Sequence, residues 1–349
     1  MKTYHARRTT TDSYQLAEGP VWDTANSRLL WVDISNGNVH VGHLDGDAIT
    51  PAATYHVDKT VGAVAATGGP DILVAGHHAV HLLSESGQTT ETARPIADDE
   101  QRRFNDGKCD PAGRFLVGTL ALGDDARESL YQIESGSHTT TVDDDLQMSN
   151  GLAWAPDGHT LYSVDTTPGL IYRRPYHPRT GQCGEREIAF TVTDGSPDGM
   201  CIDSEGNLWL AVWGTGQARR YTPTGEILAV VEVDAPYPSC ATFAGPDLDR
   251  LVITTAIDDL DDSRLARYPS SGSLFIADVD ARGLPAATWQ SCPSPNDVSP
   301  KGLSHDQHHR RNRQRRRRPG HHAHSRFMQG RADRPRRTTA RTACPRPQR

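Results

Sequence analysis

The chain is predicted to be an all-β protein, a six-bladed β-propeller, and three features of the sequence lead to that prediction. In four of the repeats, a side chain that carries an oxygen atom stands eight positions ahead of a turn residue. A short apolar run follows each turn. The turn residues stand at positions 26, 69, 113, 158, 206 and 247. Their period is about 40 to 50 residues, the range of propeller blades. No long stretch has the periodicity of a helix.

Four copies of the repeat are clear. Each places a side-chain oxygen eight positions before the turn: Glu18 before Asn26, Asn105 before Gly113, Asn150 before Gly158, and Asp198 before Gly206. The apolar runs that follow cover residues 29–32, 115–117, 161–164 and 208–212. Short β-branched and aromatic runs between tight-turn residues are typical of strands.

Two weaker copies complete the set of six. Val61 precedes Gly69 and the apolar run 72–74, and Ser239 precedes Asp247 and the run 251–253. Six repeats of four antiparallel strands close into a ring that leaves only short strand edges. The residue that opens each repeat then begins the innermost strand of its blade, so we expect these side chains to converge on the central channel.

Convergence of Glu18, Asn105, Asn150 and Asp198 predicts a metal site in that channel. An isolated Asn or Asp before Gly is most often only a turn. Here four polar residues share one register, and a buried ring of this kind without a counter-charge would cost several kcal/mol. Hard oxygen donors favour Ca²⁺, Mg²⁺ or Mn²⁺, and an all-oxygen site also accepts Zn²⁺. Such a cation can polarise a carbonyl group and lower the pKa of water.

Four ordered motifs resemble those of the SMP-30/gluconolactonase/regucalcin family. They read L-A-E-G-P-V-W-D at 16–23, R-F-N-D-G-K-C-D-P-A-G-R at 103–114, S-N-G-L-A-W-A-P-D-G at 149–158, and P-D-G-M-C-I-D-S-E-G at 197–206. The resemblance runs from about Tyr14 to about Pro285. It implies a six-bladed propeller with one divalent cation in the channel, and a hydrolase that opens sugar lactones.

The resemblance also implies roles for five residues. Glu18, Asn150 and Asp198 would be the metal ligands, and Asp198 would also be the general base for the attacking water. Asn105 would lie beside the ligands and bind the substrate or a water on the metal, and Arg103 would bind substrate hydroxyls or the carbonyl. An aspartate bound to a metal keeps a low pKa and is by itself a weak base at neutral pH. Activation of the water by the cation reduces the difference between the pKa of the water and that of the aspartate. The product would be an aldonic acid.

One segment departs from the family pattern. Beyond Gly118 and Thr119, where animal members carry paired acidic residues in a loop over the substrate, this chain reads L-A-L-G-D-D at 120–125. The lactone therefore stays open among pentonolactones, hexonolactones and related compounds. Two alternative functions also stay open: a phosphotriesterase-like hydrolase and a non-catalytic calcium-binding regulatory protein. Arg103 beside Asn105 favours a hydrolase, because an ion buffer needs no guanidinium to orient a substrate.

Other clusters of reactive residues favour ordinary explanations. His77, His78 and His81 suggest zinc but have no fourth ligand nearby, so we expect a solvated turn and strand edge. The acidic runs at 143–145 and 258–262 do not match an EF-hand and are expected to be solvated loops. The six cysteines are irregularly spaced and indicate no disulfide framework.

Charge divides the chain into two parts. Residues 301–349 hold 16 Lys or Arg against 2 Asp, a net of +14, which leaves −21 for residues 1–300 out of the total of −7. We expect a propeller over 1–295 and a disordered Arg-, Pro- and His-rich tail over 296–349. The tail is either an arm that binds nucleic acid or another polyanion, or the product of a GC-rich coding region read out of frame beyond Pro295; we favour the second.

Partners and location follow from the same composition. The start of the chain lacks an apolar signal region, and no segment approaches the roughly 20 apolar residues of a membrane span. We expect a cytoplasmic monomer that binds a small sugar lactone and no membrane. Nucleic acid is expected to bind only through the basic tail, because the body is acidic.

Overall fold

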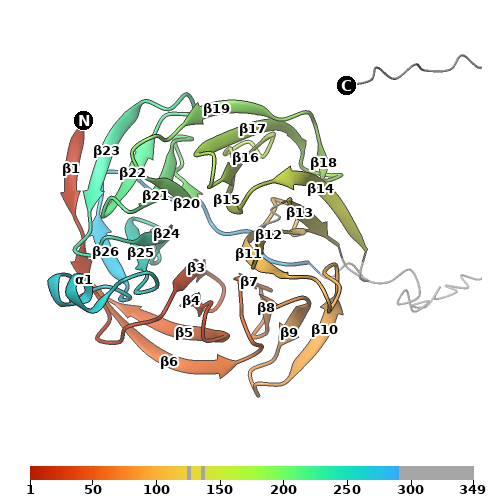
Figure 1. Cartoon of the computed structure of the whole chain (residues 1–349), viewed down its shortest axis with the longest axis horizontal. Helices are drawn as coiled ribbons and strands as arrows, with labels where there is room; N and C mark the ends of the chain where they lie inside the picture. Colours follow the sequence, from red (N-terminus) through yellow and green to blue (C-terminus); the bar gives the residue numbers. More distant parts are fainter. Residues whose placement is uncertain (124–126, 135–137, 291–349) are drawn as a thin grey trace, which may run out of the picture. The chain divides into compact units, whose positions relative to one another are not determined.

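The structure, a computed structural model, describes residues 1–123, 127–134 and 138–290. Six antiparallel sheets are arranged radially around a central channel, as Figure 1 shows. The predicted six-bladed β-propeller is thereby confirmed. The predicted boundary at residue 295 and the basic tail lie outside the described residues.

In each of blades 1 to 4, the innermost strand comes first in the chain. Blade 1 comprises β3 (Ala17–Asp23), β4 (Arg28–Asp33), β5 (Asn38–Asp45) and β6 (Ala48–His56). Blade 2 comprises β7 (Ala63–Ala66), β8 (Ile72–Ala75), β9 (Val80–Leu83) and β10 (Thr89–Ala93). Blade 3 comprises β11 (Arg102–Cys109), β12 (Phe115–Ala121), β13 (Glu128–Ile133) and β14 (Thr139–Leu146). Blade 4 comprises β15 (Ser149–Trp154), β16 (Thr160–Asp165), β17 (Leu170–His177), β18 (Gln182–Cys183) and β19 (Glu187–Thr191).

The last two blades are completed by the N-terminal residues. Blade 5 comprises β20 (Ser196–Ile202), β21 (Leu208–Trp213), β22 (Gln217–Tyr221) and β23 (Ile227–Glu232), with β1 (Lys2–His5) added in parallel to β23. Blade 6 comprises β24 (Pro238–Ala244), β25 (Arg250–Thr255) and β26 (Phe275–Asp278), with β2 (Arg7–Arg8) as its outer strand. The first eight residues therefore join blades 5 and 6 and close the ring (Figure 1).

The hydrophobic core lies between neighbouring blades. One cluster joins Trp31 of blade 1, Trp209 of blade 5 and Phe275 of blade 6, all fully buried. Four further clusters fill the spaces between the remaining pairs of blades. Packing of this kind holds the inner strands at fixed angles around the channel, which positions the residues at their ends.

In three blades, a buried carboxylate holds the turn that follows the inner strand. Asp110 accepts hydrogen bonds from the backbone N–H groups of Ala112 and Arg114 at 2.9 and 2.8 Å. Asp203 does the same for Glu205 and Asn207 at 3.0 and 2.9 Å, and also accepts from the indole of Trp209 at 3.0 Å. Asp23 occupies the equivalent position in blade 1. These bonds satisfy the buried acid and turn the chain back toward the second strand.

A β-bulge accompanies the residue that opens the repeat in five of the six inner strands. The register shifts next to Glu18, Asn105, Asn150, Asp198 and Ser239. In blade 2 the pairing of β7 with β8 is regular, and Val61 lies before the strand. A bulge re-aims a side chain relative to the sheet, so the five bulges place these side chains differently from a regular strand.

In the part of the chain that the structure describes, one short helix interrupts the all-β pattern. It is α1 (Asp262–Arg267), and it lies in the connection between β25 and β26 of blade 6. Asp261 caps it by accepting a hydrogen bond from the N–H of Arg264 at 2.8 Å. Within the described ranges, no helix is long and apolar enough to cross a membrane.

Candidate active site

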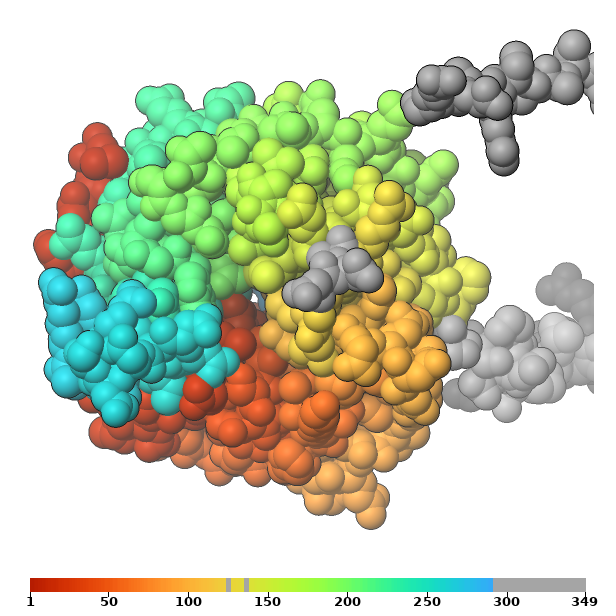
Figure 2. All heavy atoms as spheres, in the orientation of Figure 1, coloured from red at the N-terminus to blue at the C-terminus, as the bar shows by residue number. Residues whose placement is uncertain are grey.

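The structure brings the five predicted site residues together in one cavity. Its volume is about 260 Å³. Glu18, Arg103, Asn105, Asn150 and Asp198 all line it, and each is between 5% and 9% exposed. Figure 2 shows a small opening near the centre of the ring of blades. Glu18, Asn105, Asn150 and Asp198, each more than 40 positions from the next, therefore converge because each lies in the inner strand of a different blade.

The metal-ligand candidates are held by contacts among themselves and with the backbone. Nδ2 of Asn150 donates to Oδ1 of Asp198 and, at 3.1 Å, to Oγ1 of Thr166. Oε2 of Glu18 accepts from the N–H of Gly19 at 2.6 Å. With its nitrogen engaged in this way, Asn150 would present Oδ1 to a cation, and the carboxylates of Glu18 and Asp198 would supply the other donors.

Arg103 and Asn105 form a separate pair beside these ligands. Nη1 of Arg103 donates to Oδ1 of Asn105 at 2.9 Å and to the carbonyl of Phe104 at 2.8 Å. Nδ2 of Asn105 donates to the carbonyl of Ser149 at 2.9 Å. Both ends of the Asn105 amide are thus engaged within the protein, which suits a role beside the cation better than a role as a direct ligand.

The cavity carries an excess of buried negative charge. Burial, and then repulsion from Asp198 and Asp106, holds the pKa of Glu18 well above its ordinary value. Burial, and then repulsion from Asp106, does the same to the pKa of Asp198. Burial lowers the pKa of Arg103 to about 10, so the guanidinium is still charged at neutral pH. The guanidinium of Arg103 and the ammonium of Lys108, which acts on Asp106, do not offset three carboxyl groups.

Asp106 is a third acid that the sequence interpretation missed. It is 3% exposed, and its Oδ1 accepts from the N–H of Gly107 at 2.7 Å. Its Oδ2 has no hydrogen-bond partner among the described residues. An orphaned carboxylate oxygen next to Glu18 and Asp198 is expensive to bury unless a cation is close.

The residues present therefore fit a divalent cation. Carboxylate and amide oxygens are the donors that hard cations prefer, and positive charge would relieve the repulsion between Glu18 and Asp198. Within the described part of the chain, no group of three His, Cys, Asp or Glu residues is arranged to hold a metal. The third donor here is the amide of Asn150, which such a group would not include.

Eight further residues line the cavity and were not predicted: Leu16, Ile34, Leu120, Met148, Thr166, Ser196, Trp213 and Asp259. A signal for three of them was present in the sequence. Leu16, Met148 and Ser196 stand two positions before Glu18, Asn150 and Asp198, just as Arg103 stands two positions before Asn105. Residues two apart on a strand point to the same face, so this register could have identified the three.

The segment that departs from the family pattern contributes an apolar residue to the cavity. Leu120 lies in β12, pairs with Arg103 of β11, and lines the cavity. The displaced acids at 124 and 125 lie outside the described residues. With Leu16, Ile34 and Met148, Leu120 makes part of the cavity wall apolar.

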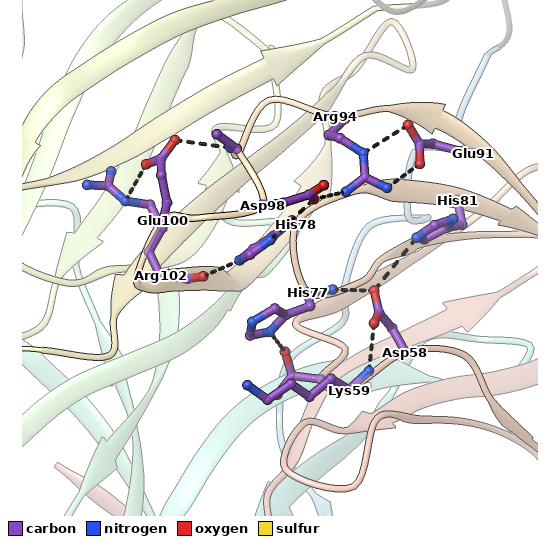
Figure 3. Close-up of polar contacts among 12 residues, drawn as sticks. Asp58, Lys59, His77, His78, His81, Glu91, Arg94, Asp98, Glu100 and Arg102 are labelled. Atoms are coloured by element: carbon purple, nitrogen blue, oxygen red, sulfur yellow. Dashed lines mark hydrogen bonds and ion pairs between the residues drawn. The ribbon is translucent and has the colours of Figure 1, made fainter.

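The expectation of a solvated turn and strand edge holds for the turn, because His77 and His78 lie between β8 and β9, but it is wrong for the solvation and for the strand of His81. Figure 3 shows the polar contacts of the histidine cluster. The side chains of His78 and His81 are only 11% and 15% exposed, and His81 lies in β9, an interior strand of its sheet. Asp58 holds the cluster by accepting from the N–H of His77 at 2.8 Å and lying 3.8 Å from Nε2 of His81. The carbonyl of His77 accepts from the N–H of Phe104, which joins this turn to the strand of Arg103.

The expectation of solvated loops is wrong for the whole first acidic run, because residues 143–145 lie in β14, and for Asp262, which begins α1. Asp143 lies in β14 rather than in a loop, and its nearly buried carboxylate pairs with Arg174 at 2.5 Å and Arg186 at 2.8 Å. Asp259 lies in a loop, as expected, but lines the cavity. A run of acidic residues indicates that a segment is polar but not which way each side chain points. The sequence therefore could not distinguish these residues from their solvated neighbours.

Comparison with known proteins places these features in a family. Residues 16–257 match the family model described as SMP-30/Gluconolactonase/LRE-like region. The chain is 34% identical over 286 residues to pentonolactonase XacC of Haloferax volcanii, covering 80% of this chain and 96% of that protein. It is 32% identical over 274 residues to a 6-deoxy-6-sulfogluconolactonase of Pseudomonas putida, covering 77% and 92%.

A solved structure is similar over nearly its whole length. It is the crystal structure of a calcium-binding protein, regucalcin, from Agrobacterium tumefaciens, with a TM-score of 0.77 and 29% identity. The match covers 83% of this chain and 98% of that one.

Proposed function

Since the chain belongs to the SMP-30/gluconolactonase/LRE-like family, we propose that it is a divalent-metal-dependent carboxylic-ester hydrolase that opens sugar lactones to aldonic acids. The observation that carries the proposal is the joint presence of Glu18, Asn150 and Asp198 with Arg103 and Asn105 in one cavity. The cavity of about 260 Å³ is slightly smaller than the pockets of about 300–1,000 Å³ that hold drug-sized ligands, so it suits a single sugar ring. The names of two relatives, a pentonolactonase and a sulfogluconolactonase, support a lactone as the substrate.

The cation would be held by Glu18, Asn150 and Asp198. When bound, it supplies a Lewis acid that polarises the lactone carbonyl and lowers the pKa of water. The similar regucalcin structure, described as calcium-binding, supports Ca²⁺ as one candidate, and Mg²⁺, Mn²⁺ and Zn²⁺ suit the same oxygen donors.

Asp198 would act as general base. Its carboxylate takes a proton from the attacking water, whose oxygen adds to the carbonyl carbon of the lactone. The bond between that carbon and the ring oxygen then breaks, and the ring oxygen leaves as a hydroxyl with the proton returned by Asp198. Thr166 holds Asn150 next to the segment of Asp198, because its Oγ1 donates to the carbonyl of Pro197 at 2.9 Å and accepts from Asn150.

Arg103 and the apolar wall would orient the substrate. The bonds from Nη1 of Arg103 fix the guanidinium and leave Nη2 for the carbonyl or a hydroxyl of the lactone. Leu16, Ile34, Leu120 and Met148 exclude water from this side of the cavity, which strengthens each polar interaction inside it.

A lactone panel tests the proposal. Pentono- and hexono-lactones, and one aryl phosphotriester, are offered to chelator-treated protein that is reloaded in turn with Ca²⁺, Mg²⁺, Mn²⁺ or Zn²⁺. We expect acid release from at least one sugar lactone, above the spontaneous rate, with at least one cation. Hydrolysis of the phosphotriester alone would assign a different reaction. Cation binding with no turnover of any lactone would assign an ion-binding protein instead.

Arg103→Ala is expected to lower kcat/KM for the best lactone roughly 10- to 100-fold, since a hydrogen bond to a charged group contributes about 1.5–3 kcal/mol. The cation should still bind, because Arg103 supplies no donor to it. Initial rates give the first quantity, and the thermal shift on adding the cation gives the second. The matched control is Arg102→Ala, since Arg102 pairs with Glu100 at 2.9 Å and does not line the cavity. Full activity of Arg103→Ala would disprove the assigned role.

A further inference from the structure

One wall of the cavity is an aromatic surface that is fixed from behind. Trp213, at the end of β21, lines the cavity and stacks on Tyr237 with ring centroids 4.3 Å apart and planes 6° apart. Tyr237 is buried and is itself held by Arg264 of α1, whose Nη1 donates to the tyrosine hydroxyl at 2.5 Å. The guanidinium also lies 4.9 Å from the centre of the Tyr237 ring. The indole therefore has little freedom to rotate away from the cavity.

The same connection between β25 and β26 brings a carboxylate to the cavity. Asp259 lines it, is exposed, and has a φ of +63°, in the left-handed region that a side chain other than glycine rarely adopts. Its neighbour Asp258 anchors the backbone: the carboxylate accepts from Nε2 of Gln15 and, at 2.8 Å, from Oγ of Ser35. The N–H of Asp258 donates to the carbonyl of Gln15 at 3.1 Å. Aspartate tolerates this conformation better than most side chains do, so the anchored backbone holds the carboxylate at the cavity.

Asp259 changes the charge that an incoming substrate meets. Among the described residues that line the cavity, Arg103 is the one basic side chain; its Nη1 is bonded to Asn105 and Phe104, and its Nη2 is the group assigned above to the lactone carbonyl or a hydroxyl. The apolar wall offers no counter-charge to an anionic group. A carboxylate, sulfonate or phosphate at the far end of a lactone would meet Asp259 without a free cationic partner, whereas a hydroxyl could donate a hydrogen bond to it.

From this arrangement we propose that Trp213 and Asp259 recognise the part of the substrate that Arg103 and the metal-ligand candidates do not contact. The indole packs on the C–H face of the sugar ring or its tail, and Asp259 accepts hydrogen bonds from its hydroxyls. The substrate class is then a neutral polyhydroxylated lactone, and lactones with an acidic tail are rejected. The inference rests on the proposed lactonase activity and goes beyond it. It also predicts a difference from the 32%-identical relative that is named for a sulfonated lactone.

The test compares two lactones that differ at one carbon. D-glucono-1,4-lactone ends in a CH₂OH group, and D-glucaro-1,4-lactone has the same ring with a carboxylate at that end. With the cation that supports turnover best, we expect kcat/KM to be at least tenfold higher for the neutral lactone. Asp259→Asn has the same shape and tolerates the left-handed conformation, and it should reduce this ratio about tenfold or more by improving turnover of the acidic lactone.

Controls separate recognition from folding. Asp262→Asn removes a charge from the same connection outside the cavity and should leave the ratio unchanged. Trp213→Ala should lower kcat/KM for both lactones by about tenfold, and Trp213→Phe should restore most of it. If Asp259→Asn does not fold, Asp259→Gly gives the same comparison, because glycine is favoured at this φ.

The outcomes distinguish the two proposals. No hydrolysis of any sugar lactone with any cation would overturn the proposed function, and this inference with it. Hydrolysis with an unchanged ratio in the Asp259 variants, or a wild-type preference for the acidic lactone, would overturn the inference alone.

Discussion

Asp198→Asn is expected to lower kcat for lactone hydrolysis by about a thousandfold, within the range of roughly 10²–10⁴ for loss of a general base. The amide has the shape of the carboxylate but does not take a proton from water at neutral pH. The variant also removes one of two carboxylates that would neutralise the cation, so cation affinity should fall. Titration of released acid measures the rate, and thermal unfolding in the presence of chelator checks the fold.

The metal-free Asp198→Asn variant should be at least as stable as the wild type. Asp198 is buried beside Glu18 and Asp106, and its removal relieves like-charge repulsion inside a low-dielectric site. A surface control is Asp247→Asn, which changes charge by the same amount in an exposed turn. Retention of a tenth or more of wild-type kcat by Asp198→Asn would show that another group accepts the proton.

The residues that could be predicted from the sequence are those tied to the repeat. Glu18, Asn105, Asn150 and Asp198 share one register, and the structure places all four in the same cavity. The residues two positions earlier follow the same alternation, and Arg103 was identified among them only because of the family motif. The bulges next to the ligands were not predictable, because an extra residue in one strand is visible only once its partner strand is known.

The rest of the site depends on contacts between blades. Trp213 of blade 5 meets Tyr237, which precedes β24 of blade 6, and Arg264 reaches Tyr237 from α1. No local pattern of hydrophobicity or charge in the sequence predicts these contacts between blades. The errors at His81 and Asp143 have the same origin, since a polar residue on a strand is buried only because of the arginine or carboxylate that a neighbouring segment supplies.

Removal of the cation is expected to abolish turnover and to reduce stability. Restoring a divalent cation at 100 times its Kd should raise the free energy of unfolding by about 2.7 kcal/mol, because it binds the folded state and not the unfolded chain. The physical source is the group of buried carboxyls, Glu18, Asp106 and Asp198, which repel one another until positive charge is placed between them. Urea unfolding with and without the cation measures the change.

Glu18→Gln makes the test specific to this site. The amide keeps an oxygen donor but removes a charge, so the stabilisation by the cation should fall by more than half and turnover should fall with it. Glu205→Gln, a change of the same chemistry at an exposed position, should leave both quantities as in the wild type. Turnover that survives the chelator would remove the cation from the mechanism. Stabilisation that survives in Glu18→Gln would place the cation elsewhere in the protein, and the convergence of the inner-strand residues would then need another explanation.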